Sequence, residues 1–174
     1  MTNYPHQTGM EATPVPPDDF AQVLLFGRHI ASLATYRQDG SIHLAAIWYM
    51  YKEGCLYFPT SSKSQKARNV KARPHASAMI DTRIPGQEQG VSVSGSATII
   101  DGNEGKRLVA EAQQRYLTEV ALSDETVGKV YAQNDDVVIM LTPIRWTTWD
   151  IAKMNLEEFD GKLGVETGYL YPLD

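Results

Sequence analysis

The sequence is nearly free of cysteine, since Cys55 is the single residue of this type among 174. One cysteine can form neither an intramolecular disulfide nor a CxxC zinc or redox pair, which favours a cytoplasmic protein over a secreted disulfide scaffold. No apolar run reaches the roughly 20 residues that a membrane-spanning helix requires, so we expect no membrane partner. Residues 1–17 are polar and proline-rich and lack the apolar stretch of a signal peptide, which predicts a flexible leader.

Several chemical motifs are missing as well. The sequence contains no GxSxG, GxGxxG or P-loop pattern, so hydrolase and phosphoryl-transfer functions have no support. None of the four histidines is spaced from another histidine, cysteine or glutamate as a metal site requires, and we expect no metal. The net charge of −5 disfavours nucleic acid as a partner. An anion site in this chain therefore has to come from a local cluster of basic residues.

The length and composition are those of one folded domain. The 174 residues, 43% of them hydrophobic, suffice for a sizeable core. We place this domain at residues 18–150. Residues 151–174 are polar and glycine-rich without clear periodicity, and we assign them to a C-terminal extension.

Alternating apolar residues dominate the predicted domain. They predict six strands, at residues 30–35, 41–51, 55–58, 75–82, 91–99 and 137–150. Asp39-Gly40 and Glu53-Gly54 are turn signals that join the first three strands into an antiparallel meander. Pro143 predicts an edge or a bulge in the last strand. Short helices are expected within residues 61–73 and at 124–132, and a longer one after Asp101. This pattern predicts an α+β protein built on a small antiparallel barrel with flanking helices.

The segment from Thr60 to Arg73 carries the clearest chemical signal. It holds five basic residues and no acidic one: Lys63, Lys66, Arg68, Lys71 and Arg73. The hydroxyls of Thr60, Ser61 and Ser62 come directly before the predicted helix start. Hydroxyl donors, basic side chains and the backbone N–H groups of a helix N-terminus are the components of a phosphate site. A solvated basic helix face explains the same charges, and composition alone leaves both interpretations open.

Seven short sequence patterns follow one another between residues 34 and 95. They are Ala-Thr at 34–35, Asp-Gly at 39–40, Ala-Ile-Trp-Tyr at 46–49, Leu-Tyr-Phe-Pro-Thr at 56–60, Lys-Ala-Arg-Asn-Val at 66–70, Ala-Ser-Ala-Met-Ile-Asp at 76–81 and Val-Ser-Val-Ser-Gly at 91–95. No single pattern is specific, but the ordered set resembles the pyridoxamine 5′-phosphate oxidase-like split barrels, which bind FMN or the deazaflavin coenzyme F-420. The resemblance implies a six-stranded antiparallel split β-barrel that forms a homodimer with the cofactor at the interface.

The resemblance also implies roles for individual residues. Those matching Thr60 and Lys66 contact the cofactor phosphate in the family. Arg68 and Asn69 match a Lys-x-Arg-Asn pattern of the flavin and deazaflavin oxidoreductases. Two tryptophans match positions near the ring system of the cofactor. The strand that leads to Trp48 lies along the ring system, and Trp149 falls where some members have a tryptophan on the last strand. The predicted cofactor-binding set is therefore Trp48, Thr60, Ser61, Ser62, Lys63, Lys66, Arg68, Asn69 and Trp149. A tryptophan such as Trp149 is more often a core or interface anchor than a residue that stacks on a cofactor.

The chain departs from true pyridoxamine 5′-phosphate oxidases near the ring. Those enzymes have an arginine and a lysine where this chain has His43 and Trp48, and a second basic residue in place of Gln65. We therefore expect no oxidation of pyridoxamine 5′-phosphate. For His43 itself, a partly buried strand histidine is the favoured explanation.

The functional hypothesis is an FMN- or F-420-dependent oxidoreductase that transfers hydride to a small conjugated organic molecule. No catalytic residue is assigned, because a flavin performs this chemistry through its own ring and the protein supplies binding and orientation. The alternative is a non-catalytic module that binds or senses flavin or haem on the same barrel.

Overall fold

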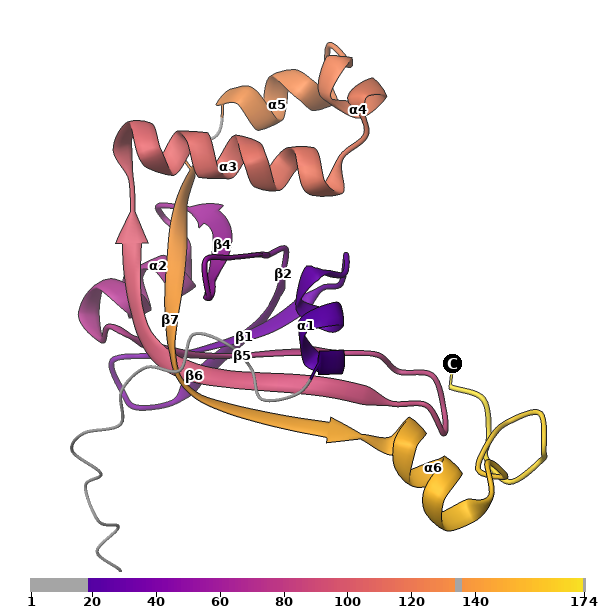
Figure 1. The fold of residues 1–174 in the computed structure, drawn as a ribbon. Helices are drawn as coiled ribbons and strands as arrows, with labels where there is room; N and C mark the ends of the chain where they lie inside the picture. Colours follow the sequence, from indigo (N-terminus) through magenta and orange to yellow (C-terminus); the bar gives the residue numbers. More distant parts are fainter. Residues whose placement is uncertain (1–18, 134–135, 174) are drawn as a thin grey trace, which may run out of the picture.

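The computed structural model describes residues 19–133 and 136–173, and the predicted leader lies outside them. Seven strands form one sheet: β1 (Ala31–Tyr36), β2 (Ile42–Ile47), β3 (Met50–Lys52), β4 (Cys55–Ser61), β5 (His75–Asp81), β6 (Gln89–Ile100) and β7 (Asp136–Asp150). Their order is β2-β1-β5-β6-β7-β4-β3, and every neighbouring pair is antiparallel. The α+β class and the antiparallel curled sheet with flanking helices are confirmed, with seven strands instead of six (Figure 1).

The additional strand arises from a break in the segment predicted as one strand at residues 41–51. The chain leaves the sheet at Trp48 and Tyr49, so β2 and β3 are separate and lie at opposite edges. A link of this length spans only about 11 Å. The sheet therefore has to curl until its two edges nearly meet, which produces a barrel with a seam at Trp48 and Tyr49.

Tyr49 explains why the chain breaks at this point. Its side chain is fully buried, and its hydroxyl donates to the carbonyls of Leu24 at 3.0 Å and Gly27 at 3.2 Å. This burial strongly raises the pKa of the Tyr49 phenol. Burying a large aromatic side chain with its hydroxyl satisfied outweighs the ladder bonds lost at one strand position.

The predicted apolar face of residues 41–51 is only partly a core face. Ile42 and Leu44 are 60% and 66% exposed, whereas Met50 is buried. The barrel interior is filled instead by side chains from all around the sheet, the largest of which are Tyr49, Phe58, Leu25, Leu33, Leu56, Ile80, Ile139 and Leu141. The outer face of β2 thus presents apolar residues to the exterior of this chain.

Pro143 lies at an irregularity between β6 and β7, as predicted. Ser94 pairs with Arg145 and Gly95 pairs with Pro143, so Ile144 is the extra residue of a bulge. The close approach requires a glycine, because a Cβ at Gly95 would lie 1.9 Å from the carbonyl oxygen of Thr142. The two long strands bend at this level, as Figure 1 shows.

Six helices surround the sheet in the described residues: α1 (Asp19–Phe26), α2 (Gln65–Ala72), α3 (Gly102–Tyr116), α4 (Glu119–Ser123), α5 (Val127–Gln133) and α6 (Ile151–Phe159). The predicted helix at 124–132 corresponds to α5, and α4 was not predicted. The extension predicted to lack periodicity begins with α6, at the far end of the bent strands (Figure 1). Its periodicity is weak because most of its apolar residues are exposed, including Leu156 at 71%. No helix of the described ranges is long and apolar enough to cross a membrane.

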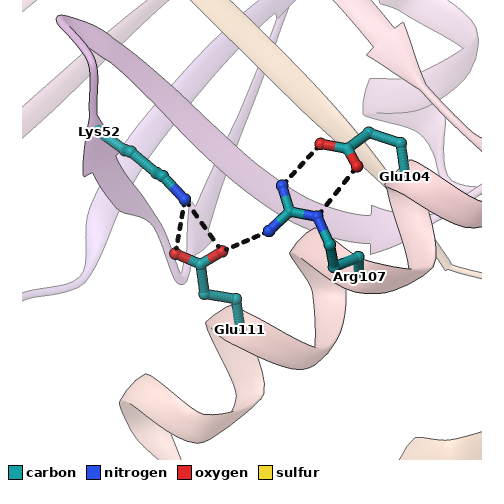
Figure 2. A network of polar contacts seen from close by, with 4 residues as sticks. All are labelled: Lys52, Glu104, Arg107 and Glu111. Atoms are coloured by element: carbon teal, nitrogen blue, oxygen red, sulfur yellow. Dashed lines mark hydrogen bonds and ion pairs between the residues drawn. The ribbon is translucent and has the colours of Figure 1, made fainter.

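Helix α3 is held against β3 by a chain of charged side chains. The Lys52 ammonium on β3 lies 3.2 Å from the Glu111 carboxylate (Figure 2). The Arg107 guanidinium lies 3.3 Å from the same carboxylate and 2.7 Å from that of Glu104. At the other end of α3, the Arg115 guanidinium donates to the carbonyls of Phe26 and Gly27. These contacts set the position of Tyr116, the last residue of the helix.

Candidate functional site

The turn between β4 and α2 is built from hydroxyl groups. Ser64 caps α2, and its Oγ accepts from the Ala67 N–H at 3.2 Å and from the Thr60 hydroxyl at 3.1 Å. The Ser61 Oγ accepts from the Lys63 N–H at 3.2 Å. The predicted helix start is confirmed, and its N-terminus is fixed against the end of β4. We call residues 60–73 the α2 cradle.

Lys66 is the exceptional basic residue of the α2 cradle. The other four basic residues of the segment, Lys63, Arg68, Lys71 and Arg73, are exposed, whereas Lys66 is half-buried. Burial lowers the pKa of the Lys66 ammonium below its ordinary value of 10.5. Within the described part of the chain, this ammonium forms no hydrogen bond or ion pair. A partly desolvated cation without a counter-charge is costly, and an anion beside it would remove the cost.

The two arginines of the segment already have partners. The Arg68 guanidinium donates to the Lys63 carbonyl and, at 2.7 Å, to Gln65 Oε1, which braces the turn. Arg73 donates to the Gln38 carbonyl at 3.2 Å. Arg68 therefore shapes the α2 cradle in this structure, with two of its five N–H donors engaged.

Asn69 points into the protein. Its Nδ2 donates to the Thr35 hydroxyl on β1 at 3.0 Å, and its Oδ1 accepts from Gln65 Nε2 at 2.7 Å. Asn69 and Thr35 are both buried. Asn69, which was predicted to contact the cofactor, thus connects α2 to β1 of the sheet. A direct contact between Asn69 and the cofactor stays a prediction.

His43 is the residue that sequence reasoning weighed and left out. It lies on β2 directly opposite Thr35. Its Nδ1 atom is buried and has no hydrogen-bond partner among the described residues. Burial and the positive charges of Arg37 and Lys66 lower its pKa below the ordinary value of 6.5. The site therefore holds a second polar group, beside Lys66, that lacks a partner.

An apolar cavity of about 540 Å³ opens at the barrel seam. It is lined by Ile30, Ala46, Ile47, Trp48, Pro59, Val109, Gln113, Tyr131 and Asp136. Pro59 directly precedes Thr60, and Asp136 pairs with Ser61, so the cavity adjoins the α2 cradle. Its volume is within the range of small-molecule and cofactor sites.

Trp48 forms one wall of this cavity and is fixed by stacking. Its ring is parallel to that of Tyr116, with centroids 4.9 Å apart, and lies 6.1 Å from Tyr131 at 18°. The Tyr116 hydroxyl lies 2.7 Å from the His29 carbonyl and accepts from the Tyr49 N–H at 3.3 Å. Neither tyrosine is identifiable as a site residue from the sequence, because each reaches Trp48 only through the packing of α3 and α5. Ser64 was also missed, although a serine before Gln-Lys-Ala is an ordinary capping signal.

Trp149 is separated from the other predicted residues. Asp136, at the start of β7, pairs with Ser61, and Trp149 lies 13 positions further, about 40 Å of extended strand. Its ring covers Gly90, where a Cβ would lie 1.8 Å from it. Within one chain the structure therefore gathers the predicted set around the α2 cradle and the cavity except for Trp149.

No group of three or more His, Cys, Asp or Glu side chains that could hold a metal ion occurs in the described residues. The polar part of the site instead consists of hydroxyls, one half-buried lysine and one histidine. Such a donor set has the chemistry that suits an anion, and an adjoining apolar cavity suits a planar group.

Comparison with known proteins agrees with this arrangement. Residues 17–150 match the family model described as pyridoxamine 5′-phosphate oxidase. No curated protein matches the sequence. Among solved structures, a conserved hypothetical protein from Mycobacterium tuberculosis is similar at 26% identity and a TM-score of 0.68, covering 87% of this chain and 95% of its own.

Two further structures share the fold. An F-420 reductase is 26% identical with a TM-score of 0.57, over 75% of this chain and 98% of its own. The haem storage protein HutZ from Vibrio cholerae is 14% identical with a TM-score of 0.58, over 78% of this chain and 95% of its own. At that identity the last likeness concerns the fold alone.

Proposed function

The chain belongs to the pyridoxamine 5′-phosphate oxidase family, and we propose that it is an oxidoreductase that binds FMN or the deazaflavin F-420 and acts on a small conjugated organic molecule. The observation that carries this proposal is Lys66, a half-buried ammonium without a partner in the described residues, at a helix N-terminus lined with hydroxyls. The similarity to an F-420 reductase supports the same cofactor class.

Each part of the site has a defined task in this proposal. Lys66 and the Ser61 hydroxyl hold the cofactor phosphate, with the backbone N–H groups of Gln65 and Lys66 at the start of α2 beside them. The Thr60 hydroxyl joins them by exchanging its bond to Ser64. Trp48, fixed by Tyr116, forms an apolar wall for the ring. When bound, the flavin supplies two-electron chemistry through its own ring. The protein orients the ring and keeps water from one side of it.

The substrate is not pyridoxamine 5′-phosphate. That molecule carries its own phosphate and needs a second basic cluster near the ring. Among the described residues, the cavity lining contains no lysine or arginine and presents Trp48 instead. FMN-loaded protein incubated with pyridoxamine 5′-phosphate and oxygen should form no aldehyde. Turnover on the order of 1 per second or faster, an ordinary enzymatic rate, would show that this reading of the cavity is wrong.

We further propose a homodimer with the cofactor at the interface. The outer face of β2 carries the exposed apolar residues Ile42 and Leu44, and Trp149 lies too far from the α2 cradle of its own chain to contact the same cofactor. A second copy that covers β2 explains both features. Sedimentation of the cofactor-loaded protein should give about twice the chain mass of 19.4 kDa. A loaded monomer would contradict the dimer.

The deciding experiment is the absorption spectrum and mass of the small molecule that the purified protein carries or takes up. FMN or F-420 in one-to-one ratio supports the proposal. Reduction of that flavin by NAD(P)H or by reduced deazaflavin, followed by reoxidation with a conjugated acceptor, separates an enzyme from a binding module. A haem spectrum would favour the storage or sensing function, for which the fold similarity to HutZ is the supporting observation.

A further inference from the structure

His43 lies beside Lys66 because of three linked contacts. In the β1–β2 ladder His43 is directly opposite Thr35, and residues opposite each other point to the same face. The Thr35 hydroxyl accepts from Asn69 of α2 at 3.0 Å. Lys66 precedes Asn69 by one helical turn and lies on the same side of α2. The imidazole and the ammonium therefore flank the same space.

The surroundings of His43 provide positive charge but no hydrogen-bond acceptor or donor for its inner nitrogen. Nδ1 is buried without a partner among the described residues. The charged groups that act on the ring are Arg37, just after β1, and Lys66, and both are cations. The neighbours Thr35 and Asn69 are neutral and already bonded to each other. Such a ring stays neutral until an anion arrives, because a third positive charge has no counter-charge.

We propose that His43 is a proton-dependent contact of the cofactor phosphate, so that flavin binding is coupled to the uptake of one proton by His43 from the solvent. This rests on the proposed function. A phosphate dianion beside Lys66 supplies the missing counter-charge, and a protonated imidazole then donates a charge-assisted hydrogen bond from the nitrogen that is now unpartnered. The affinity for FMN should therefore fall as the pH rises, which makes the proposed phosphate site responsive to pH.

The test compares the wild-type protein with His43→Gln, which keeps a neutral polar side chain. FMN is titrated calorimetrically between pH 7.0 and 8.5, above the second ionisation of a phosphate monoester near pH 6, in pairs of phosphate-free buffers with different ionisation enthalpies. The wild type should take up more protons than the variant. Its affinity should fall by about threefold or more over this range, against a ceiling of tenfold per pH unit for one coupled proton.

Two controls isolate the phosphate contact. Riboflavin has the same ring without the phosphate, so its binding should show equal proton uptake in both proteins. His43→Arg carries a permanent charge, and its FMN affinity should be independent of pH in this range. Circular dichroism and the thermal midpoint confirm that each variant is folded.

The outcomes separate this inference from the proposed function. FMN binding with equal proton uptake in wild type and His43→Gln would overturn the role of His43 and leave the flavin site standing. If no flavin binds, the proposed function is wrong. In that case the pKa of His43 is measured by NMR with and without inorganic phosphate. A His43 pKa that does not rise with phosphate overturns the proposed contact.

Discussion

The α2 cradle and the charged chain on α3 are two charged clusters of the same molecule that differ in electrostatic balance. In the α3 chain each cation meets a carboxylate: Lys52 with Glu111, and Arg107 with both Glu111 and Glu104 (Figure 2). In the α2 cradle Lys66 has no partner within the described chain, and the nearby His43 has a buried nitrogen without one. A cluster balanced internally works as a clamp, whereas an unbalanced one is complementary to a ligand that brings the missing charge.

The largest expected effect is on the unbalanced side. Lys66→Ala should weaken FMN or F-420 binding about tenfold or more, because a hydrogen bond to a charged group contributes about 1.5–3 kcal/mol. Titration followed by flavin fluorescence measures this. Lys52→Ala is the matched control, since Lys52 is also partly buried but belongs to the balanced cluster. This substitution should leave the cofactor affinity unchanged. Equal losses in both variants would mean that net charge, and not the α2 cradle, attracts the cofactor.

A second substitution at Lys66 distinguishes an effect on binding from an effect on stability. Lys66→Met should not lower the free energy of unfolding of the cofactor-free protein, because it removes a desolvated cation without a partner. A clear loss of stability would show that Lys66 has a structural partner and would weaken the comparison.

Asn69 should have the next largest effect, and on stability. Asn69→Ala leaves the buried Thr35 hydroxyl without its donor, which costs about 2 kcal/mol in the free energy of unfolding. Urea denaturation measures the loss. The double variant Thr35→Val, Asn69→Leu removes both partners and should lose less than the sum of the two single changes. A fully additive result would mean that the bond contributes little.

The balanced cluster should respond weakly to substitution. Glu111→Gln should cost about 0.5 kcal/mol of stability, because exposed ion pairs contribute little and the two side chains are each 38% exposed. The cost should decrease in high salt, and the FMN affinity should stay the same. A cost several times larger would show that α3 depends on this clamp for its position against β3.

The smallest effect separates the two clusters by pH. The pKa of His43 is lowered in the folded protein, so the stability it contributes is fully present above its ordinary value of 6.5 and is lost as the pH falls from there through the folded pKa. The pKa of Glu104 is lowered from 4.5, so its contribution persists to lower pH and is lost only as the pH falls through its folded pKa. Denaturation midpoints of wild type and His43→Gln between pH 5 and 8 should diverge below about pH 6.5. Parallel curves would contradict the lowered pKa.

Much of this molecule follows from local sequence. Asp39-Gly40 and Glu53-Gly54 mark the turns at which the strands reverse, Pro143 marks the bulge, and the hydroxyl-rich, basic segment after Thr60 marks the start of α2. These features depend on residues close together in the chain, where conformational preference and spacing act directly. The fold class, and the helix start at which we propose the phosphate site, were therefore predictable.

Other features were decided by contacts between distant residues. The alternation through residues 41–51 has the same period on both sides of Trp48, so it cannot reveal that Tyr49 leaves the sheet to bind the carbonyl of Leu24. Nor does the sequence around Tyr116 indicate that its ring stacks on Trp48. A periodic pattern fixes which residues share a face only while the strand continues.

The balance of charge is the clearest case. By itself the sequence determined that five cations lie between residues 63 and 73 in an acidic protein, and that a helix begins among them. Only the tertiary structure decided which cation is half-buried, by leaving the other four exposed and placing Lys66 beside His43 of β2. The physical reason is that a charge's cost depends on its burial and its neighbours, and both are properties of the packed fold.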